Sequence, residues 1–294
     1  MDCWTSSFEL RKHVLDSLKE LKITPSRQRG QNFLIDSNII NYQINQANIQ
    51  PKDIVLEIGG GIGNLSKCIA SKAKKLIIIE HDKRMISFLT NFLQDFSNVE
   101  IIQGDAVKTD FPRFTKCVSN LPYQISSPIT FKILEYPFDL AILMYQREFA
   151  QRFFAKPGTK NYSRLSVMIN LKAICRNLKT VKPTSFYPQP KIYSSIVAIT
   201  KKDEVHLEDN EDFSAFVRML FTNKKKTIRS ILFNIMKRKE KQNILVERKV
   251  LETLQFMDRR VFTMSIEELL QLYGHMKERI GEELWLNMIS PNMK

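Results

Sequence analysis

Cysteine is scarce in this sequence of 294 residues, and its four cysteines stand far apart. No C-x-x-C pair occurs, so neither a zinc site nor a disulfide framework is indicated, and we expect no bound metal. Long apolar runs are also missing: none approaches the roughly 20 residues of a membrane span, and residues 1–8 do not resemble a secretion signal. We therefore expect a cytoplasmic protein with free cysteines and no membrane association.

Acidic residues are almost missing from one block of the chain. The whole sequence has 45 Lys and Arg against 31 Asp and Glu, a formal net charge of +14. Residues 145–202 contain 12 Lys and Arg but a single acid, Glu148, and residues 218–260 contain 13 basic residues against four acids. Such clusters attract a polyanion, and nucleic acid is the leading candidate. The alternative is a solvated surface in a protein from a lysine-rich proteome.

Short apolar runs alternate with helical patterns in the first two thirds of the chain. This alternation predicts an α/β fold with a parallel, doubly wound sheet. The expected parallel strands are residues 53–58, 75–79, 99–103, 117–119 and 139–144. Two further strands, near 174–181 and 192–200, are expected to extend this sheet in antiparallel fashion.

Charged amphipathic helices replace this pattern after residue 202. We expect them near 210–222, 224–239, 244–255 and 265–287. The chain is therefore predicted to have an N-terminal extension (1–29), a sheet domain (30–202) and a small all-α C-terminal domain (203–294).

Glycines and acids stand where the first three strands end. Gly59-x-Gly61-x-Gly63 follows the first strand, Glu80 ends the second, 21 residues after Gly59, and Asp105 follows the third. A glycine loop with an acid about 20 residues later is typical of a site for an adenosine ligand. The dinucleotide pattern requires a glycine where this chain has Asn64. We therefore favour S-adenosylmethionine, which has no pyrophosphate, over NAD.

The run Asn120-Leu121-Pro122-Tyr123 follows the fourth strand. Asn120 offers an amide oxygen, Pro122 turns the chain so that carbonyls can face a ligand, and Tyr123 offers a flat ring. An adenine amine is a poor nucleophile, and such acceptors can hold its hydrogens and aim its nitrogen at a sulfonium methyl group, while Tyr123 stacks on the extruded base. No general base is needed. The alternative is an ordinary turn that ends a strand.

These motifs together resemble the KsgA-type ribosomal RNA adenine dimethyltransferases, over about residues 25–202. The resemblance rests on the glycine loop, the strand-end acids, the run at 120–128, Gln31-Asn32-Phe33-Leu34 and Phe186-x-Pro188-x-Pro190-Lys191. Residues 143–150 are more similar to archaeal and eukaryotic members. The resemblance implies a Rossmann-like class I methyltransferase sheet. It also implies dimethylation of two adjacent adenosines near the 3′ end of small-subunit rRNA, within an assembling ribosomal subunit.

The resemblance also implies roles for particular residues. The methyl donor would contact the glycine loop and its surroundings, at Asn32, Leu34, Gly59, Gly61, Glu80, Asp105 and Asn120. The target base would contact Asn120, Leu121, Pro122, Tyr123 and Phe186, although Phe186 could instead be a core residue. RNA phosphates would bind basic residues of the two basic regions, at Arg147, Arg152, Lys156, Lys224, Lys225 and Lys226. We expect the protein to act as a monomer.

Two other functions remain open on the sequence. Macrolide-resistance methyltransferases of the same fold modify large-subunit rRNA, but they more usually carry Asn-Ile-Pro where this chain has Asn-Leu-Pro. Relatives that serve as mitochondrial transcription factors use the fold mainly to bind nucleic acid. The intact run 120–123, together with Glu80 and Asp105, favours catalysis.

Overall fold

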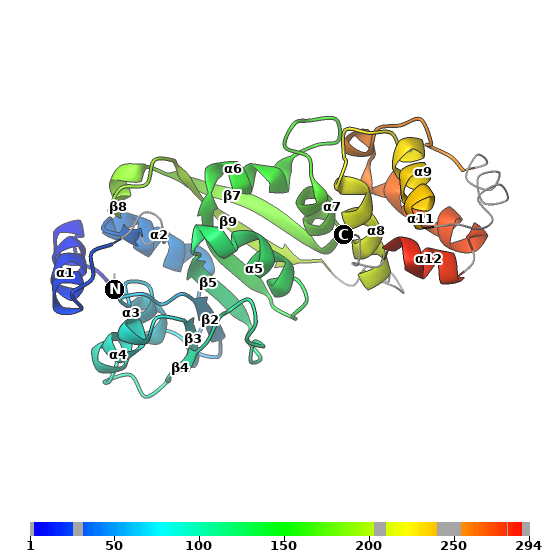
Figure 1. Cartoon of the computed structure of the whole chain (residues 1–294). Coiled ribbons are helices and arrows are strands. Elements are labelled where there is room, and N and C mark those ends of the chain that lie inside the picture. Colours follow the sequence, from blue (N-terminus) through cyan, green and yellow to red (C-terminus); the bar gives the residue numbers. More distant parts are fainter. Residues whose placement is uncertain (1–2, 26–31, 203–209, 240–253, 281, 290–294) are drawn as a thin grey trace. The chain divides into compact units, whose positions relative to one another are not determined.

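The chain divides into two compact units (Figure 1). The computed structural model describes residues 3–25, 32–202, 210–239, 254–280 and 282–289. The first unit comprises Met1–Ala150 and Ala173–Asp203, and the second comprises Gln151–Lys172 and Glu204–Lys294. The segment Gln151–Lys172, expected within the sheet domain, thus groups with the C-terminal helices. The N-terminal segment groups with the sheet.

A seven-stranded sheet forms the centre of the first unit, in the order β4-β3-β2-β5-β6-β9-β7. Its strands are β2 (Ile54–Ile58), β3 (Lys75–Glu80), β4 (Val99–Gln103), β5 (Lys116–Asn120), β6 (Leu140–Gln146), β7 (Ala173–Val181) and β9 (Ser194–Lys201). Strands β2 to β6 pair in parallel, and β9 pairs antiparallel with both β6 and β7. The predicted α/β sheet with its antiparallel addition is confirmed.

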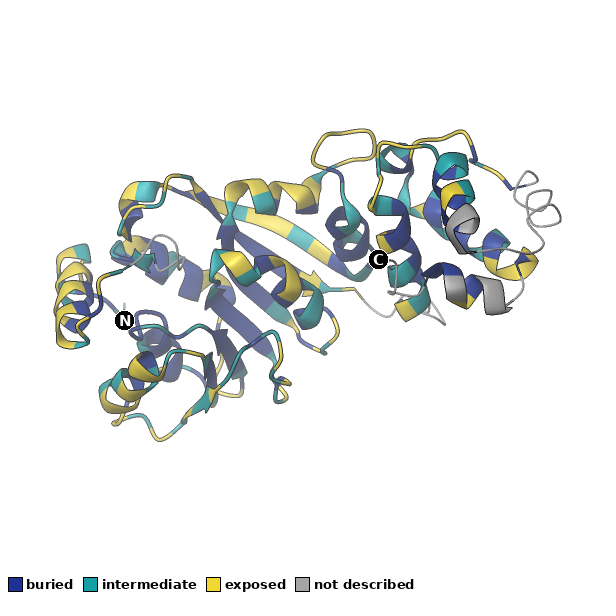
Figure 2. Ribbon diagram, in the orientation of Figure 1, coloured by how far each residue is buried: buried dark blue, intermediate teal, exposed yellow. Residues whose placement is uncertain are grey.

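Three helices connect parallel strands: α3 (Ser66–Ala70) joins β2 to β3, α4 (Lys83–Phe92) joins β3 to β4, and α5 (Ser126–Ile133) joins β5 to β6. Helix α2 (Ser37–Ala47) precedes β2, and α6 (Arg147–Gln151) follows β6. Asp36 and Asp82 begin α2 and α4 by accepting a hydrogen bond from the second backbone N–H that follows. Helix α2 packs on β5 and β6, while α3 and α4 pack on β3 and β4. The central strands β2, β3, β5 and β6 are mostly buried, whereas the edge strands β4 and β7 are partly exposed, β7 along much of its length (Figure 2).

A second, two-stranded sheet was not expected from the sequence. Strand β1 (Phe33–Leu34) pairs antiparallel with β8 (Phe186–Tyr187), so that Leu34 lies opposite Phe186. Strand β8 follows the short 3-10 helix η4 (Pro183–Ser185), and Ser185 donates a hydrogen bond to the Asp36 carboxylate. The pairing thus joins the segment before α2 to the segment before β9.

The N-terminal segment folds back onto the first unit. Helix α1 (Ser7–Glu20) begins at Ser6, whose hydroxyl accepts a hydrogen bond from the Glu9 N–H. Cys3 forms a disulfide with Cys68 of α3. The expectation of free cysteines is therefore wrong for this pair. Their sequence separation of 65 residues gave no sign that α1 returns to α3. Cys117 and Cys175 are free.

Helices make up most of the described part of the second unit. They are α7 (Arg164–Lys172), α8 (Asn210–Phe221), α9 (Ile228–Lys239), α11 (Ile266–Arg279) and α12 (Glu282–Ile289), with the 3-10 helices η3 (Arg152–Phe154) and η5 (Val261–Thr263). The helix expected near 244–255 lies, up to residue 253, outside the described residues. Phe216, Tyr273 and Trp285 pack ring against ring between α8, α11 and α12.

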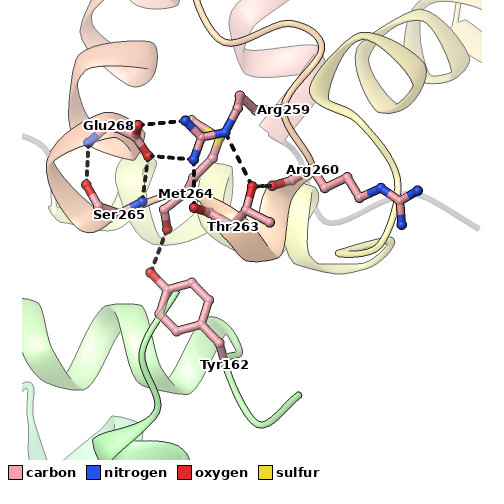
Figure 3. Close-up of polar contacts among 7 residues, drawn as sticks. All are labelled: Tyr162, Arg259, Arg260, Thr263, Met264, Ser265 and Glu268. Carbon is pink, nitrogen blue, oxygen red and sulfur yellow. Dashed lines mark hydrogen bonds and ion pairs between the residues drawn. The ribbon is translucent and has the colours of Figure 1, made fainter. Parts of the chain in front are cut away.

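Polar contacts attach the segment Gln151–Lys172 to the C-terminal part of the second unit (Figure 3). The Tyr162 hydroxyl donates to the Met264 carbonyl at 3.0 Å. The next residue, Ser265, begins α11 with a reciprocal capping box that it forms with Glu268. Arg259 pairs with the Glu268 carboxylate at 3.0 Å and donates to the Thr263 carbonyl at 2.9 Å. The contact of Tyr162 thus joins this segment to Met264, and the other contacts fix the turn that contains Met264.

Candidate active site

A cavity of about 710 Å³ opens in the first unit, at the carboxyl edge of strands β2 to β5. Parallel strands bring their carboxyl ends to one edge of a sheet, and ligands of such sheets bind there. The cavity is lined by all the residues predicted to contact the donor or the base: Asn32, Leu34, Gly59, Gly61, Glu80, Asp105, Asn120, Leu121, Pro122, Tyr123 and Phe186. Their proximity is a property of the fold, and their individual roles remain predictions.

The glycine loop after β2 forms the floor of this cavity. Gly59 and Gly61 have φ angles of +78° and +57°, which side chains rarely permit. A Cβ atom on Gly59 would lie 3.4 Å from the Cδ of Pro122, so the loop also packs closely on the run after β5. The Gly61 N–H donates to the Glu80 carboxylate at 3.0 Å. The loop and the end of β3 are thus fixed to each other.

Two carboxylates end the neighbouring strands. Glu80 accepts further hydrogen bonds from the N–H groups of His81 and Asp82, at 2.7 and 3.0 Å. An ionised carboxylate has about four acceptor positions, so Glu80 can still accept from a ligand hydroxyl. Asp105 follows β4 and accepts from the Val107 N–H through one oxygen, Oδ1. The pair is held in place by backbone contacts and faces the cavity as acceptors.

Asn120 ends β5 with an unsatisfied acceptor. Its Oδ1 atom is buried and has no hydrogen-bond partner among the described residues. The strand ends behind it are held by Gln43, whose amide donates to the carbonyls of Ser119 and Ile142, both at 3.3 Å. A buried acceptor without a partner costs roughly 1–3 kcal/mol, a cost that a ligand donor would remove. The exocyclic amine of adenine is a donor of this kind.

The ring of Tyr123 is fixed at its hydroxyl end. Tyr123 begins the 3-10 helix η2 (Tyr123–Ile125), and its hydroxyl bonds with the hydroxyl of Ser194 in β9 at 2.5 Å. Burial raises the pKa of Tyr123, so the phenol is neutral at physiological pH. A neutral ring held at one end is suited to stack on a planar base.

Phe186 is both a wall of the cavity and a core residue. Its side chain is only 3% exposed, and it belongs to the cluster that contains Leu34 and Met144. The other residue of β8, Tyr187, is 37% exposed. Packing therefore accounts for much of the position of Phe186, whichever ligand the cavity holds.

Glu57 lines the cavity and was not singled out from the sequence. Its side chain lies within β2 and is 2% exposed. Burial, together with the negative charge of Glu80, raises the pKa of Glu57 to about 8. The sequence signal was present, since an acid interrupts the apolar run Ile54–Ile58, but periodicity alone did not show that this position is buried.

The basic residues predicted to bind RNA fall in both units. Arg147 begins α6 in the first unit, and its guanidinium lies 6.0 Å from the centre of the Tyr193 ring. In the second unit, the Lys224 ammonium donates to the carbonyls of Lys160 and Tyr162, at 2.9 and 2.6 Å. Lys224 thus has a structural role that the sequence did not indicate. The remaining predicted residues are exposed: Arg152, Lys156, Lys225 and Lys226.

Within the described ranges, no group of three or more His, Cys, Asp or Glu side chains could hold a metal ion. Of the helices that the structure describes, none has the length and apolarity needed to cross a membrane.

The sheet order and the acids at its carboxyl edge define a class I methyltransferase fold. Residues 24–273 match the sequence model of the family described as "Ribosomal RNA adenine dimethylase". The chain therefore belongs to the ribosomal RNA adenine dimethylase family, which confirms both the predicted resemblance and the predicted enzyme class.

Individual relatives agree with this membership. A protein of Methanococcus aeolicus named "Probable ribosomal RNA small subunit methyltransferase A" is 44% identical over 83% of this chain and 93% of its own length. A protein of Thermococcus onnurineus with the same name is 38% identical over 91% of this chain and 98% of its own. Both relatives are archaeal, which agrees with the predicted similarity of residues 143–150 to archaeal and eukaryotic members.

Solved structures show the same similarity. A dimethyladenosine transferase from Plasmodium falciparum has a TM-score of 0.73 and 33% identity, covering 84% of this chain and 98% of that one. The 23S rRNA methyltransferase ErmE has a TM-score of 0.60 and 26% identity, covering 83% of this chain and 99% of that one. The enzyme from Plasmodium is therefore more similar to this chain than ErmE, in both fold and sequence.

Proposed function

We propose that this protein transfers methyl groups from S-adenosylmethionine to the N6 amines of two adjacent adenosines near the 3′ end of small-subunit rRNA. Each amine receives two methyl groups, and the substrate is an assembling ribosomal subunit. The observation that carries the proposal is the buried, unpaired Oδ1 of Asn120 at the wall of the cavity. We further propose that the protein acts as a monomer in the cytoplasm.

The donor would lie between the glycine loop and the strand-end acids. Glu80 accepts hydrogen bonds from the ribose hydroxyls, and Asp105 accepts from the adenine amine of the donor. Gly59 and Gly61 leave room for the ligand because they carry no side chain. Asn32 and Leu34 also line the cavity. The donor supplies an electrophilic methyl group, and these residues only bind and orient it.

The target adenosine would enter from the side of Tyr123. The Asn120 oxygen and the backbone carbonyls near Pro122 accept the two hydrogens of the N6 amine, which favours tetrahedral geometry at nitrogen and frees its lone pair for in-line attack. Tyr123 stacks on the extruded base, in a position fixed by Ser194. After transfer, the product cation loses one proton to water, so no general base is needed.

RNA would be held through its phosphates. The exposed cations of both units, Arg147, Arg152, Lys156, Lys225 and Lys226, suit phosphate contacts, and Lys224 contributes charge beside them. Phosphate contacts carry no sequence information, and the base edges of A-form RNA lie in a deep, narrow groove. We therefore infer that the folded subunit, more than the local sequence, determines where the protein acts.

Large-subunit rRNA is the main alternative substrate, because ErmE shares the fold and is named for 23S rRNA. Two measurements test the proposal. Calorimetry with S-adenosylmethionine should show saturable binding, which a protein that only binds nucleic acid would lack. Incubation with labelled donor should then place label in immature small subunits and not in immature large subunits. Label in large subunits alone would refute the proposed substrate.

A further inference from the structure

The N-terminal segment 3–23 lies against the outside of the donor cavity, and the proposed reaction gives it no role. This segment precedes residue 24, where the family match begins. Helix α1, dark blue in Figure 1, packs beside α2 and buries Leu10, Val14 and Leu18. Cys3, which precedes α1, forms a disulfide with Cys68 of α3, the helix that follows the glycine loop.

Two side chains of this segment hold carbonyls of the glycine loop. The Trp4 indole N–H donates to the Asn64 carbonyl at 2.8 Å, and His13 Nε2 lies 3.0 Å from the Ile62 carbonyl. Because a carbonyl only accepts, Nε2 carries the proton in this contact. Burial lowers the pKa of His13, so the ring is neutral near pH 7. Both Ile62 and Asn64 line the cavity.

The same segment is also attached to α2. The Ser37 N–H at the start of α2 donates to the Ser7 hydroxyl at 3.0 Å, and the Asn41 amide donates to the Trp4 carbonyl at 3.3 Å. The Asn64 amide in turn donates to the Leu34 carbonyl at 2.9 Å. Trp4 thus contacts both Asn64 after the glycine loop and Asn41 of α2, and Asn64 itself bonds to Leu34 of β1.

Aromatic packing fixes His13 between these contacts. Its ring lies 5.0 Å from the Trp4 ring and 4.6 Å from the Phe92 ring, centre to centre. Phe92 covers the loop so closely that a Cβ atom on Gly63 would lie 2.7 Å from it. His13 of α1 thus packs between Trp4 and Phe92 of α4, the residue that lies against Gly63 of the loop.

We propose that Trp4 and His13 are positioning residues that hold the glycine loop in the conformation that binds the methyl donor. A loop with three glycines at positive φ has many alternative conformations, and a ligand that orders such a loop loses affinity. The contacts from α1 impose this order before the donor arrives. This inference rests on the proposed function, since it takes the cavity to be the donor site.

Calorimetry on the full chain with S-adenosylmethionine tests the inference. Trp4→Phe keeps most of the ring but removes the N–H, and His13→Ala removes the second contact. Each should weaken donor binding by roughly 3- to 10-fold, the effect of losing one hydrogen bond. The rate at saturating donor should stay within about 2-fold of the wild type, because neither residue contacts the reacting atoms. His13→Gln keeps an amide N–H and should recover most of the affinity.

The matched control is Phe8→Ala, which removes an aromatic ring from the same helix at a position that is 79% exposed. Its donor affinity should equal that of the wild type. If the double variant Trp4→Phe/His13→Ala binds the donor with wild-type affinity, with or without a lower melting temperature, the positioning role is overturned. Failure of the wild type itself to bind the donor would instead refute the proposed function, and this inference with it.

Discussion

At the scale of single residues, the buried Oδ1 of Asn120 is an acceptor without a hydrogen-bond donor in the described part of the chain, and an adenine amine would supply that donor. Asn120→Ala removes this acceptor, and we expect the rate of methyl transfer to fall by roughly 10²- to 10³-fold, as when one transition-state contact is lost. Affinity for the assembling subunit should change little. Rapid-quench transfer from labelled donor measures the rate, and filter binding measures the affinity.

The control for this substitution is Gln124→Ala. Gln124 is an exposed amide in the same turn and does not line the cavity. Its rate should match that of the wild type. A rate near wild type in Asn120→Ala would show that the amide does not act on the amine.

The raised pKa of Glu57 predicts how the stability of the fold depends on pH. Its pKa of about 8 in the folded protein exceeds the ordinary value of 4.5, so between these values the folded state binds a proton that the unfolded state has lost. Stability contributed by this group is therefore complete below pH 4.5 and falls as pH rises towards 8. Glu57→Gln should flatten this decline in urea unfolding measured from pH 5 to 8. An unchanged decline of stability with pH would show that another group binds the proton.

At the scale of secondary-structure elements, the pairing of β1 with β8 depends on Phe186. Phe186→Ala should lower the free energy of unfolding by about 3 kcal/mol, the usual cost of deleting a buried aromatic side chain. The neighbouring substitution Tyr187→Ala is the control, because that side chain is 37% exposed and should cost under about 1 kcal/mol. Urea unfolding distinguishes the two, and equal losses would contradict the packing described here.

Elements with a strong pattern could be predicted from the sequence, and elements made by distant contacts could not. The apolar runs at 53–58 and 75–79 both form strands where the pattern placed them, because an apolar run marks a buried strand locally. Strands β1 and β8 have two residues each and no pattern of their own. Their pairing, like the return of α1 to the glycine loop, depends on contacts across more than 50 residues.

The same distinction applies to the candidate site. Glu80, Asp105 and Asn120 were found because polar residues that end apolar strands converge in a parallel sheet. Trp4 and His13 were missed because their partners are backbone carbonyls, which carry no sequence signature. Ser194 was missed because its hydroxyl bonds to that of Tyr123, a residue distant in the sequence, and no local pattern indicates this pairing.

At the scale of the whole molecule, charge on the second unit is proposed to hold the RNA. The double variant Lys225→Glu/Lys226→Glu should weaken binding to the assembling subunit. The slope of the logarithm of the binding constant against the logarithm of salt concentration should become shallower by roughly 0.7 to 0.9 per lost phosphate contact. Both side chains are exposed, so the fold should survive. Donor affinity should not change. Filter binding across a salt series measures the slope.

The control for charge alone is Lys52→Glu. Lys52 is exposed and lies just before β2, at the amino end of the strand and so at the opposite sheet edge from the cavity. This substitution should leave the salt slope close to that of the wild type. A slope indifferent to Lys225 and Lys226 would show that the second unit does not grip phosphates.

The central claim is that the cavity beside Asn120 methylates adenosine N6 in the small subunit. Mass spectrometry of rRNA nucleosides tests it most directly, after immature small subunits are incubated with S-adenosylmethionine and either the wild type or Asn120→Ala. We expect the wild type to produce two N6,N6-dimethyladenosines per subunit, at adjacent positions near the 3′ end, and the variant to produce almost none. Absence of dimethyladenosine with the wild type, or equal yields with both proteins, would contradict the account.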